Sequence, residues 1–187
     1  EKGTVRLILN GASISSSSTA PVVVEEAKKV LVTLADGTTN TITDKTRQSV
    51  DDEDFSSAVY SKADLVFNGS GTLNVNAGYR NGIKSTDDLK VVSGTFNITS
   101  NEDGIIGKDF LGIKDGKFTI KSGSDGMKST YDTDTSKGNI VITGGDGLDS
   151  NGNIVMNGGN VTVIGPTSDG DTALDFDGAF TINGGVL

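Results

Sequence analysis

The chain has 187 residues, of which 25 are acidic and 16 are basic, giving a formal net charge of −9. This negative charge repels nucleic acid and anionic membrane surfaces and attracts cations, so we expect no nucleic-acid partner. The sequence contains no cysteine and no histidine. Disulfides, zinc sites with thiolate or imidazole ligands, and Ser-His-Asp catalysis are therefore excluded.

The remaining composition is typical of an all-β protein. The chain has 26 glycines, only two prolines, and many Asn, Asp, Ser and Thr residues, which favour short strands joined by tight turns. Only residues 25–30 have a helical pattern. No stretch approaches the 18 or more apolar residues of a membrane span, so we expect no membrane insertion. An acidic, Gly/Asn/Thr-rich β-solenoid is typical of secreted or cell-surface bacterial proteins, and we expect that location.

The N-terminal part of the chain, residues 1–48, has a repeated apolar pattern. Leu7 and Leu9 recur as Val30 and Val32, a spacing of 23 residues, which predicts N-terminal coils. An acidic loop follows at residues 49–56, and regular coils occupy residues 57–187, so we expect a single domain over residues 1–187. The chain starts in a strand and stops mid-coil, which predicts truncation at both ends. Open coil ends are unpaired strand edges and favour end-to-end self-association.

From residue 57 onward a period of about 22 residues is visible. It is marked by Asn81-Gly82, Asp103-Gly104, Asp125-Gly126 and Asp146-Gly147. Apolar residues two apart send both side chains to one face of a strand, and their recurrence in each coil predicts ladders along the axis. The pattern predicts a right-handed parallel β-helix with three short strands per coil. The apolar columns are Leu65, Leu89 and Leu111; Phe67, Val91 and Ile113; Leu73, Phe96 and Phe118; and Val75, Ile98 and Ile120.

One coil departs from this period. After Met127, residues 131–137 form a loop, and residues 139–143 leave room for one apolar strand where neighbouring coils have two. Either the solenoid is narrowed here or a segment is missing. The last coils have a longer period: Ile154 and Met156 recur as Phe180 and Ile182, and Val161 recurs as Leu187, each 26 residues later.

The Asp-Gly turns place Asp103, Asp125 and Asp146 in one column, with Asn81 beside them. Each Asp-Gly pair can simply be a turn, in which Asp caps the bend and Gly supplies a positive φ. In-register carboxylates about 5 Å apart disfavour joint ionisation, so they either splay into water or bind a cation between coils. With only oxygen ligands available, that cation is predicted to be calcium.

A second acidic set lies at the next bend of each coil. It comprises Asp64, Asp87, Asp88, Asp109, Asp132 and Asp134, and it is either a calcium-binding rim or a solvated acidic surface. From the two sets we predict these calcium ligands: Asp87, Asp103, Asp109, Asp125, Asp132, Asp134 and Asp146.

Several segments resemble a known family. They are residues 61–65 (SKADL), residues 68–73 (NGSGTL), the repeated Asp-Gly-Ile/Met/Leu turns, residues 165–167 (GPT) and residues 173–178 (ALDFDG). Together they resemble the calcium-binding, polysaccharide-lyase-like β-helix proteins of plant-biomass-degrading anaerobic bacteria, which are carbohydrate-binding domains. The resemblance implies several calcium ions, cellulose or acidic sugars as ligands, and a fold like that of family-nine polysaccharide lyases. The short coil near residues 138–146 and Phe176, where tyrosine is expected, depart from the family pattern.

The function expected is therefore non-catalytic binding of plant cell-wall polysaccharide. The chain has no Trp and only three Tyr, so its residues favour acidic glycans over flat crystalline cellulose. Candidate sugar-binding residues are Lys84, Lys128, Tyr79 and Tyr131. One alternative is a structural solenoid that assembles end to end into a surface filament or adhesin. Another is a calcium-dependent lyase with Lys84 or Lys128 as the base, although their acidic neighbours stabilise the protonated amine.

Overall fold

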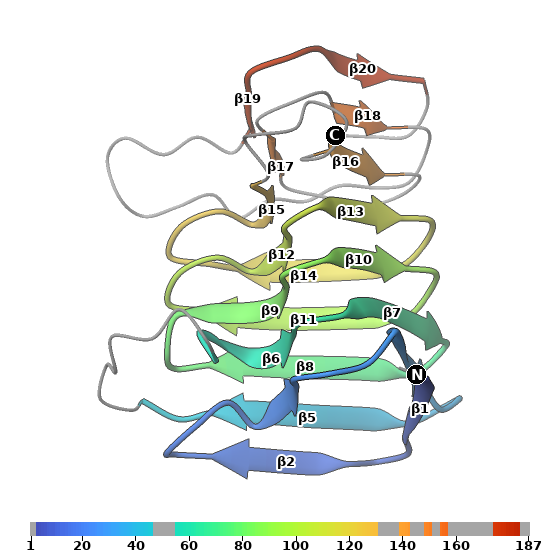
Figure 1. Ribbon diagram of the computed structural model, residues 1–187, viewed down its shortest axis with the longest axis vertical. Helices are drawn as coiled ribbons and strands as arrows, with labels where there is room; N and C mark the ends of the chain where they lie inside the picture. The colour runs from blue at the N-terminus through green and yellow to red at the C-terminus, as the bar shows by residue number, and fades with distance from the viewer. Residues whose placement is uncertain are drawn as a thin grey trace.

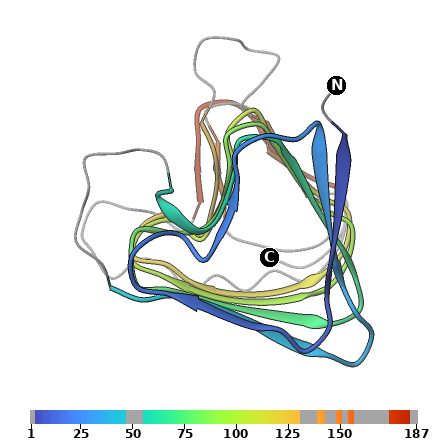
Figure 2. The same cartoon turned by 60° about the horizontal axis from the view of Figure 1, so that its bottom comes forward.

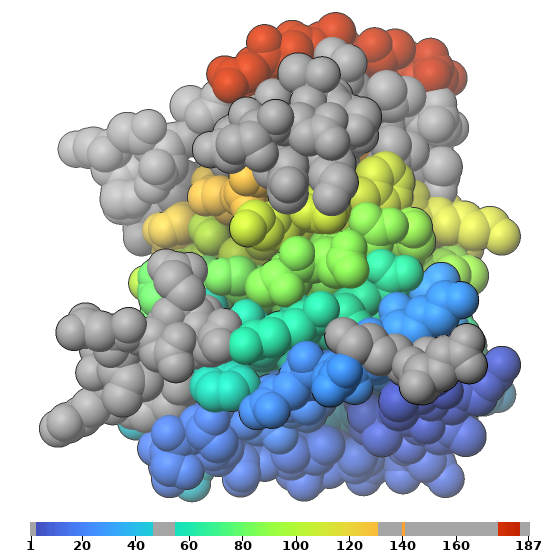
Figure 3. All heavy atoms as spheres, viewed as in Figure 1, coloured from blue at the N-terminus to red at the C-terminus, as the bar shows by residue number. Residues whose placement is uncertain are grey.

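The computed structural model describes residues 3–46, 55–130, 139–142, 148–150, 154–156 and 174–183. The secondary structure of these residues is a stack of β-strands that form three parallel sheets (Figure 1). No helix among them is long and apolar enough to cross a membrane. Successive coils lie on one another along the long axis, and the space-filling view shows them as a series of bands (Figure 3).

Each sheet takes one strand from each regular coil. Sheet A contains β1 (Thr4–Leu9), β4 (Lys29–Leu34), β7 (Asp64–Gly69), β10 (Asp88–Val91), β13 (Phe110–Ile113), β16 (Asn139–Ile142), β18 (Ile154–Met156) and β20 (Phe180–Ile182). Sheet B contains β2 (Ser13–Ser16), β5 (Thr39–Asp44), β8 (Thr72–Ala77), β11 (Thr95–Ser100) and β14 (Lys117–Lys121). Sheet C contains β3 (Val22–Val24), β6 (Ser57–Ser61), β9 (Asn81–Ser85), β12 (Ile105–Gly107), β15 (Met127–Ser129), β17 (Leu148–Ser150) and β19 (Leu174–Phe176).

The tilted view shows the three sheets enclosing a common interior (Figure 2). Buried apolar side chains from all three sheets form one core there. Leu65, Leu89 and Leu111 are register partners in neighbouring coils, and all three are buried. The other three predicted columns are paired in the same way and are also buried. The predicted parallel β-helix with three strands per coil is therefore confirmed.

Aromatic rings form a stack through the middle of this core. Phe96 in β11 is fully buried, and its ring lies parallel to that of Phe118 in β14, with ring centroids 5.1 Å apart. The ring of Phe67 is nearly perpendicular to that of Phe96, with ring centroids 5.5 Å apart. Rings on neighbouring coils are within contact distance because parallel strands are about 4.8 Å apart.

Two N-terminal predictions are corrected. Leu7 pairs with Val32, and Leu9 pairs with Leu34, so the repeat there is longer than the spacing expected from the sequence. A shift of two residues keeps the same side chains facing inward, and the alternation alone cannot detect it. Residues 25–30 form no helix: they lead into β4, in which Leu31 alternates with the buried Val30 and Val32.

The short coil near residue 140 is present in the structure. Ile140 of β16 pairs with Leu111 on one side and with Ile154 on the other, and Ile154 follows after a much shorter segment than in the regular coils. Sheet B ends at β14 in the described part of the chain, and β16 is the one described strand between β15 and β17, in agreement with the prediction. The predicted recurrence of Ile154 as Phe180 is confirmed by their pairing. The acidic residues 51–54 and the repeat of Val161 as Leu187 lie outside the described residues.

The glycines of the stacked turns have a role other than the expected one. Gly82 and Gly104 are absent from the positive-φ glycines of the described chain, so a left-handed backbone does not explain them. A Cβ on Gly104 would lie 2.5 Å from the carbonyl oxygen of Gly126 in the next coil, and one on Gly82 would lie 2.4 Å from that of Gly104. Close approach of neighbouring backbones therefore requires glycine at these positions.

Replacing Gly104 with alanine should destabilise the protein. The added methyl group would meet backbone on one side and the Ile120 side chain, at 2.6 Å, on the other. Overpacking of this kind costs about 1–3 kcal/mol, which denaturant unfolding would measure. Gly3→Ala is the control, because a Cβ there meets nothing within 4 Å. Equal denaturant midpoints for Gly104→Ala and Gly3→Ala would show that the coils can move apart without loss of stability.

Candidate functional site

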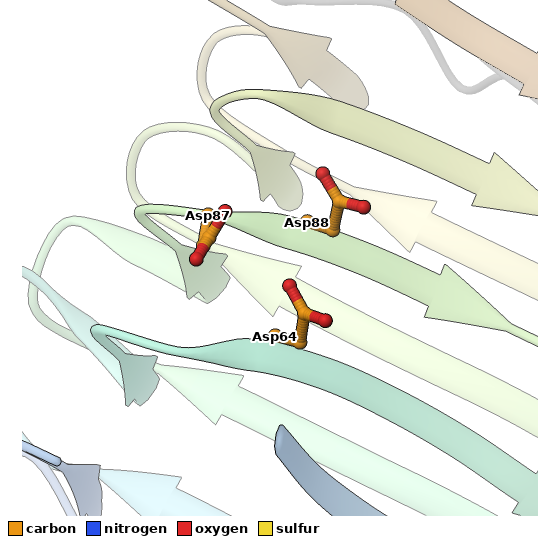
Figure 4. Close-up of side chains that lie close together, drawn as sticks. All are labelled: Asp64, Asp87 and Asp88. Carbon is orange, nitrogen blue, oxygen red and sulfur yellow. The ribbon is translucent and has the colours of Figure 1, made fainter. Parts of the chain in front are cut away.

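Three carboxylates converge on the outer surface of sheet A, at the first residues of its strands β7 and β10. Asp64 and Asp88 open β7 and β10, and each precedes an inward-facing leucine, so alternation points both carboxylates outward. Asp87 is placed beside them by the bend that leads into β10. One oxygen from each of the three lies within 4.8 Å of the others (Figure 4). We call Asp64, Asp87 and Asp88 the acidic cluster.

Lysines and backbone groups fix the position of the acidic cluster. Lys29 Nζ lies 3.6 Å from a carboxylate oxygen of Asp64, and Lys90 Nζ lies 2.7 Å from one of Asp88. The backbone N–H of Asp87 donates to the hydroxyl oxygen of Ser85 at 3.1 Å. The cluster side chains remain partly accessible, with 26% of the Asp64 side chain and 29% of the Asp88 side chain exposed.

One member of the acidic cluster, Asp87, lies in an environment that disfavours its charged form. Burial raises the pKa of Asp87, and the negative charges of Asp64, Asp109 and Asp88 raise it further. Asp109 lies one coil further along, and its backbone N–H donates to the Asp87 carbonyl oxygen at 3.4 Å. A cation among these oxygens would offset both burial and repulsion, and an all-oxygen donor set suits calcium. Among the described residues, this cluster is the one group of three or more possible ligands with this geometry.

The predicted Asp-Gly column has a different arrangement. The side-chain Oδ1 of Asn81 accepts the backbone N–H of Asp103 at 3.0 Å, and Oδ1 of Asp103 accepts that of Asp125 at 3.1 Å. Each side chain therefore bonds to the turn of the next coil. One oxygen of each of these two residues joins successive coils and contributes to the fold directly.

A lysine ammonium lies beside the second oxygens of this column. Lys128 Nζ contacts Oδ2 of Asp125 and lies 3.7 Å from Oδ2 of Asp103. Burial raises the pKa of Asp103, although Lys128 and the Asp125 backbone N–H act in the opposite direction. The positive charge next to these two carboxylates in the structure is therefore Lys128, and calcium binding by Asp103 and Asp125 stays a prediction.

The other predicted site residues have varied positions. Tyr79 is only 8% exposed, so its ring has no free face for a sugar. Lys84 lies on β9, and its Nζ donates to Ser56 Oγ at 3.2 Å. Asp132, Asp134, Asp146 and Tyr131 lie outside the described residues.

Sequence reasoning did not select two members of the cluster as ligands. The sequence places Asp64 and Asp88 in the second acidic set, directly before Leu65 and Leu89 of one apolar column, but the predicted ligands come from the Asp-Gly column and from other members of that set. The pairing of Leu65 with Leu89 places them side by side. The signal that could have identified them is the shared motif of an Asp directly before the inward leucine that opens each strand.

Comparison with known proteins identifies the family. A family model described as "Carbohydrate-binding domain-containing protein" matches residues 1–147, well over half of the chain. The chain belongs to this family. A relative in this carbohydrate-binding domain family, from Acetivibrio thermocellus, bears the same description and is 35% identical over 95 residues, which is 49% of this chain. The match covers 33% of that relative, so this chain spans about a third of its length.

A solved structure is similar to this chain. The polysaccharide lyase-like protein from C. thermocellum, as a gadolinium derivative, superposes with a TM-score of 0.84 and is 29% identical. The superposition covers 98% of the present chain and 78% of the solved chain.

Proposed function

We propose that this domain binds acidic polysaccharide, and that calcium held by the acidic cluster bridges the protein to the sugar carboxylates. The observation that carries the proposal is the convergence of Asp64, Asp87 and Asp88 on an accessible face. Membership of the carbohydrate-binding domain family supports glycan binding. The gadolinium derivative of the similar structure supports a metal site, because gadolinium, like calcium, is a hard cation that prefers oxygen.

The coordination chemistry leaves room for a ligand. Calcium takes six to eight oxygens, and three carboxylates supply only part of that shell. Water, or a carboxylate and hydroxyl of a uronic acid, would complete it. The open surface at Asp64 and Asp88 gives a polymer access that a closed structural site would not.

The lysines favour binding over catalysis. A lyase needs a free base beside the metal, but the lysines that contact the cluster, Lys29 and Lys90, are each paired with one of its carboxylates. The predicted bases Lys84 and Lys128 lie on β9 and β15 of sheet C. Lys128 is also held by two carboxylates, which stabilise its charged form. We therefore propose a non-catalytic domain. A partly exposed site of this kind suits the high calcium concentrations outside cells, consistent with a secreted or cell-surface bacterial protein.

Calcium should raise the melting temperature of the wild-type chain relative to excess EDTA. A ligand at 100 times its Kd adds about 2.7 kcal/mol to the free energy of unfolding. In Asp64→Asn/Asp88→Asn most of this rise should be lost, and calcium-dependent retention on polygalacturonate should be lost with it. Differential scanning calorimetry and affinity electrophoresis measure the two effects.

Two control variants locate the effect. Asp115→Asn alters an exposed carboxylate that accepts the Gly116 N–H through Oδ1, an atom that asparagine keeps, and it should behave as wild type. Asp103→Asn/Asp125→Asn tests the Asp-Gly column. If only Asp103→Asn/Asp125→Asn lost the calcium response, the metal site would be assigned to the Asp-Gly column instead. No calcium response in the wild type would reject the proposed site.

A further inference from the structure

The outward column that contains the acidic cluster continues into an aromatic residue. Phe110 opens β13 and is the register partner of Asp88 in the preceding coil. It precedes the buried Leu111, so alternation turns the Phe110 side chain outward, and it is partly exposed. Along the solenoid axis, Asp64, Asp88 and Phe110 therefore follow one another at steps of about 4.8 Å.

The Phe110 ring lies over Gly112, two residues further along β13. A Cβ on Gly112 would lie 2.5 Å from Cε1 of the ring and 3.1 Å from Cζ. The register partners of Gly112 in neighbouring coils are Lys90 and Val141, both of which have side chains. The absence of a side chain at Gly112 thus allows the ring to lie along the sheet, and no positive φ requires glycine there.

A shallow hollow lies beside the ring. Its volume is about 250 Å³, and it is bordered by Phe110, Gly112, Lys90, Val92 and Lys114 among others. Val92 is 38% exposed and extends the apolar floor. The hollow is smaller than a typical drug-sized pocket and has the scale of a single sugar ring.

Two lysines give this apolar surface a positive border. Lys90 Nζ lies 5.3 Å from the centroid of the Phe110 ring, and Lys114 borders the hollow. Lys90 also pairs with Asp88, so it lies between the hollow and the acidic cluster. In a chain with a net charge of −9, Lys114 and Lys90, the latter shared with Asp88, place positive charge beside a partly exposed aromatic ring, which suits an anionic ligand with an apolar face.

We propose that Phe110 and Gly112 form a stacking subsite for one uronate ring, with Lys90 and Lys114 facing the carboxylate of that sugar. This subsite rests on the proposed function, since the next sugar carboxylate along the chain would reach calcium at the acidic cluster. The step of about 4.8 Å between strands is close to the length of one sugar residue, so the polymer would run along the solenoid axis. The subsite selects an acidic glycan over a neutral one.

The test uses oligogalacturonides and cello-oligosaccharides of equal length, with the full chain in calcium. Phe110→Ala should weaken oligogalacturonide binding about tenfold by calorimetry, the order of a lost aromatic contact. Gly112→Val introduces the residue found at position 141, the register partner of Gly112. The valine side chain should displace the Phe110 ring and weaken oligogalacturonide binding by a similar factor. Both variants should keep the calcium-dependent rise in melting temperature. Phe176→Ala, at a 38% exposed phenylalanine on β19 of sheet C, is the matched control.

The outcomes separate the subsite from the proposed function. Wild-type affinity in both Phe110→Ala and Gly112→Val, with calcium-dependent binding intact, would overturn the subsite and leave the proposed function standing. Equal binding of neutral and acidic oligosaccharides would overturn the role of the lysines and the choice of uronate. A wild-type chain that responds to calcium but binds no uronate would overturn both proposals.

Discussion

Phe96→Ala should lower the free energy of unfolding by about 3–5 kcal/mol, the range for truncating a buried phenylalanine. Phe96 is fully buried in β11, with the ring of Phe118 stacked on it and the ring of Phe67 nearly perpendicular to it. Coils on both sides are held by backbone ladders, so they cannot close the cavity without breaking strand pairs. Denaturant unfolding followed by circular dichroism measures the loss.

Phe176→Ala provides the comparison for this core substitution. The Phe176 side chain is 38% exposed and meets only the tilted ring of Phe180, at 5.6 Å, among the described aromatic residues. Its removal should change stability by about 0.5 kcal/mol or less, as for most surface positions. Equal losses for the two variants would contradict the view that the aromatic stack is the centre of the core.

The central coils could be predicted because one physical pattern determines both their faces and their pairing. Alternation fixes which side chains point inward, and the recurrence of Leu65 as Leu89 and Leu111 fixes which coils are neighbours. At the N-terminus the same logic gave a wrong register. Pairing Leu7 with Val30 or with Val32 buries the same face, and only the loop between the strands distinguishes the two.

The site was harder to predict, because a column of aspartates in the sequence does not show which positive group lies beside their carboxylates. The sequence placed Asp103 and Asp125 in one column, but it did not show that Lys128 would lie within reach of both. It named the rim that contains Asp64 and Asp88, and the predicted column of Leu65 and Leu89 places them side by side, but nothing in the sequence distinguished them from the other acidic residues of that rim. Phe110 was missed because the position of its ring over Gly112 is visible only in three dimensions.

Lys128→Met should destabilise the protein at neutral pH, by about 2 kcal/mol. Removing one partner of a buried ion pair costs about 3–5 kcal/mol, and the partial exposure of these side chains reduces that figure. The side chains of Asp103 and Asp125 are 14% and 18% exposed and would lose their common cation. Methionine keeps most of the apolar stem of the lysine, so the loss reports mainly on charge. Lys121→Met, at an exposed position that ends β14, is the control for the loss of a surface lysine.

The pH dependence of Lys128→Met separates charge from packing. Burial raises the pKa of Asp103 and Lys128 lowers it, so removing Lys128 should raise the Asp103 pKa further. A carboxyl whose folded-state pKa lies above its unfolded value binds more protons when folded, so the variant should regain stability as the pH falls from neutral through that raised pKa. Its deficit relative to wild type should therefore shrink in mildly acidic buffer, as thermal melts at several pH values would show. A deficit that stays constant with pH would assign the loss to packing. Stabilisation of the variant by calcium through the Asp-Gly column would show that these carboxylates can hold a metal once the lysine is gone.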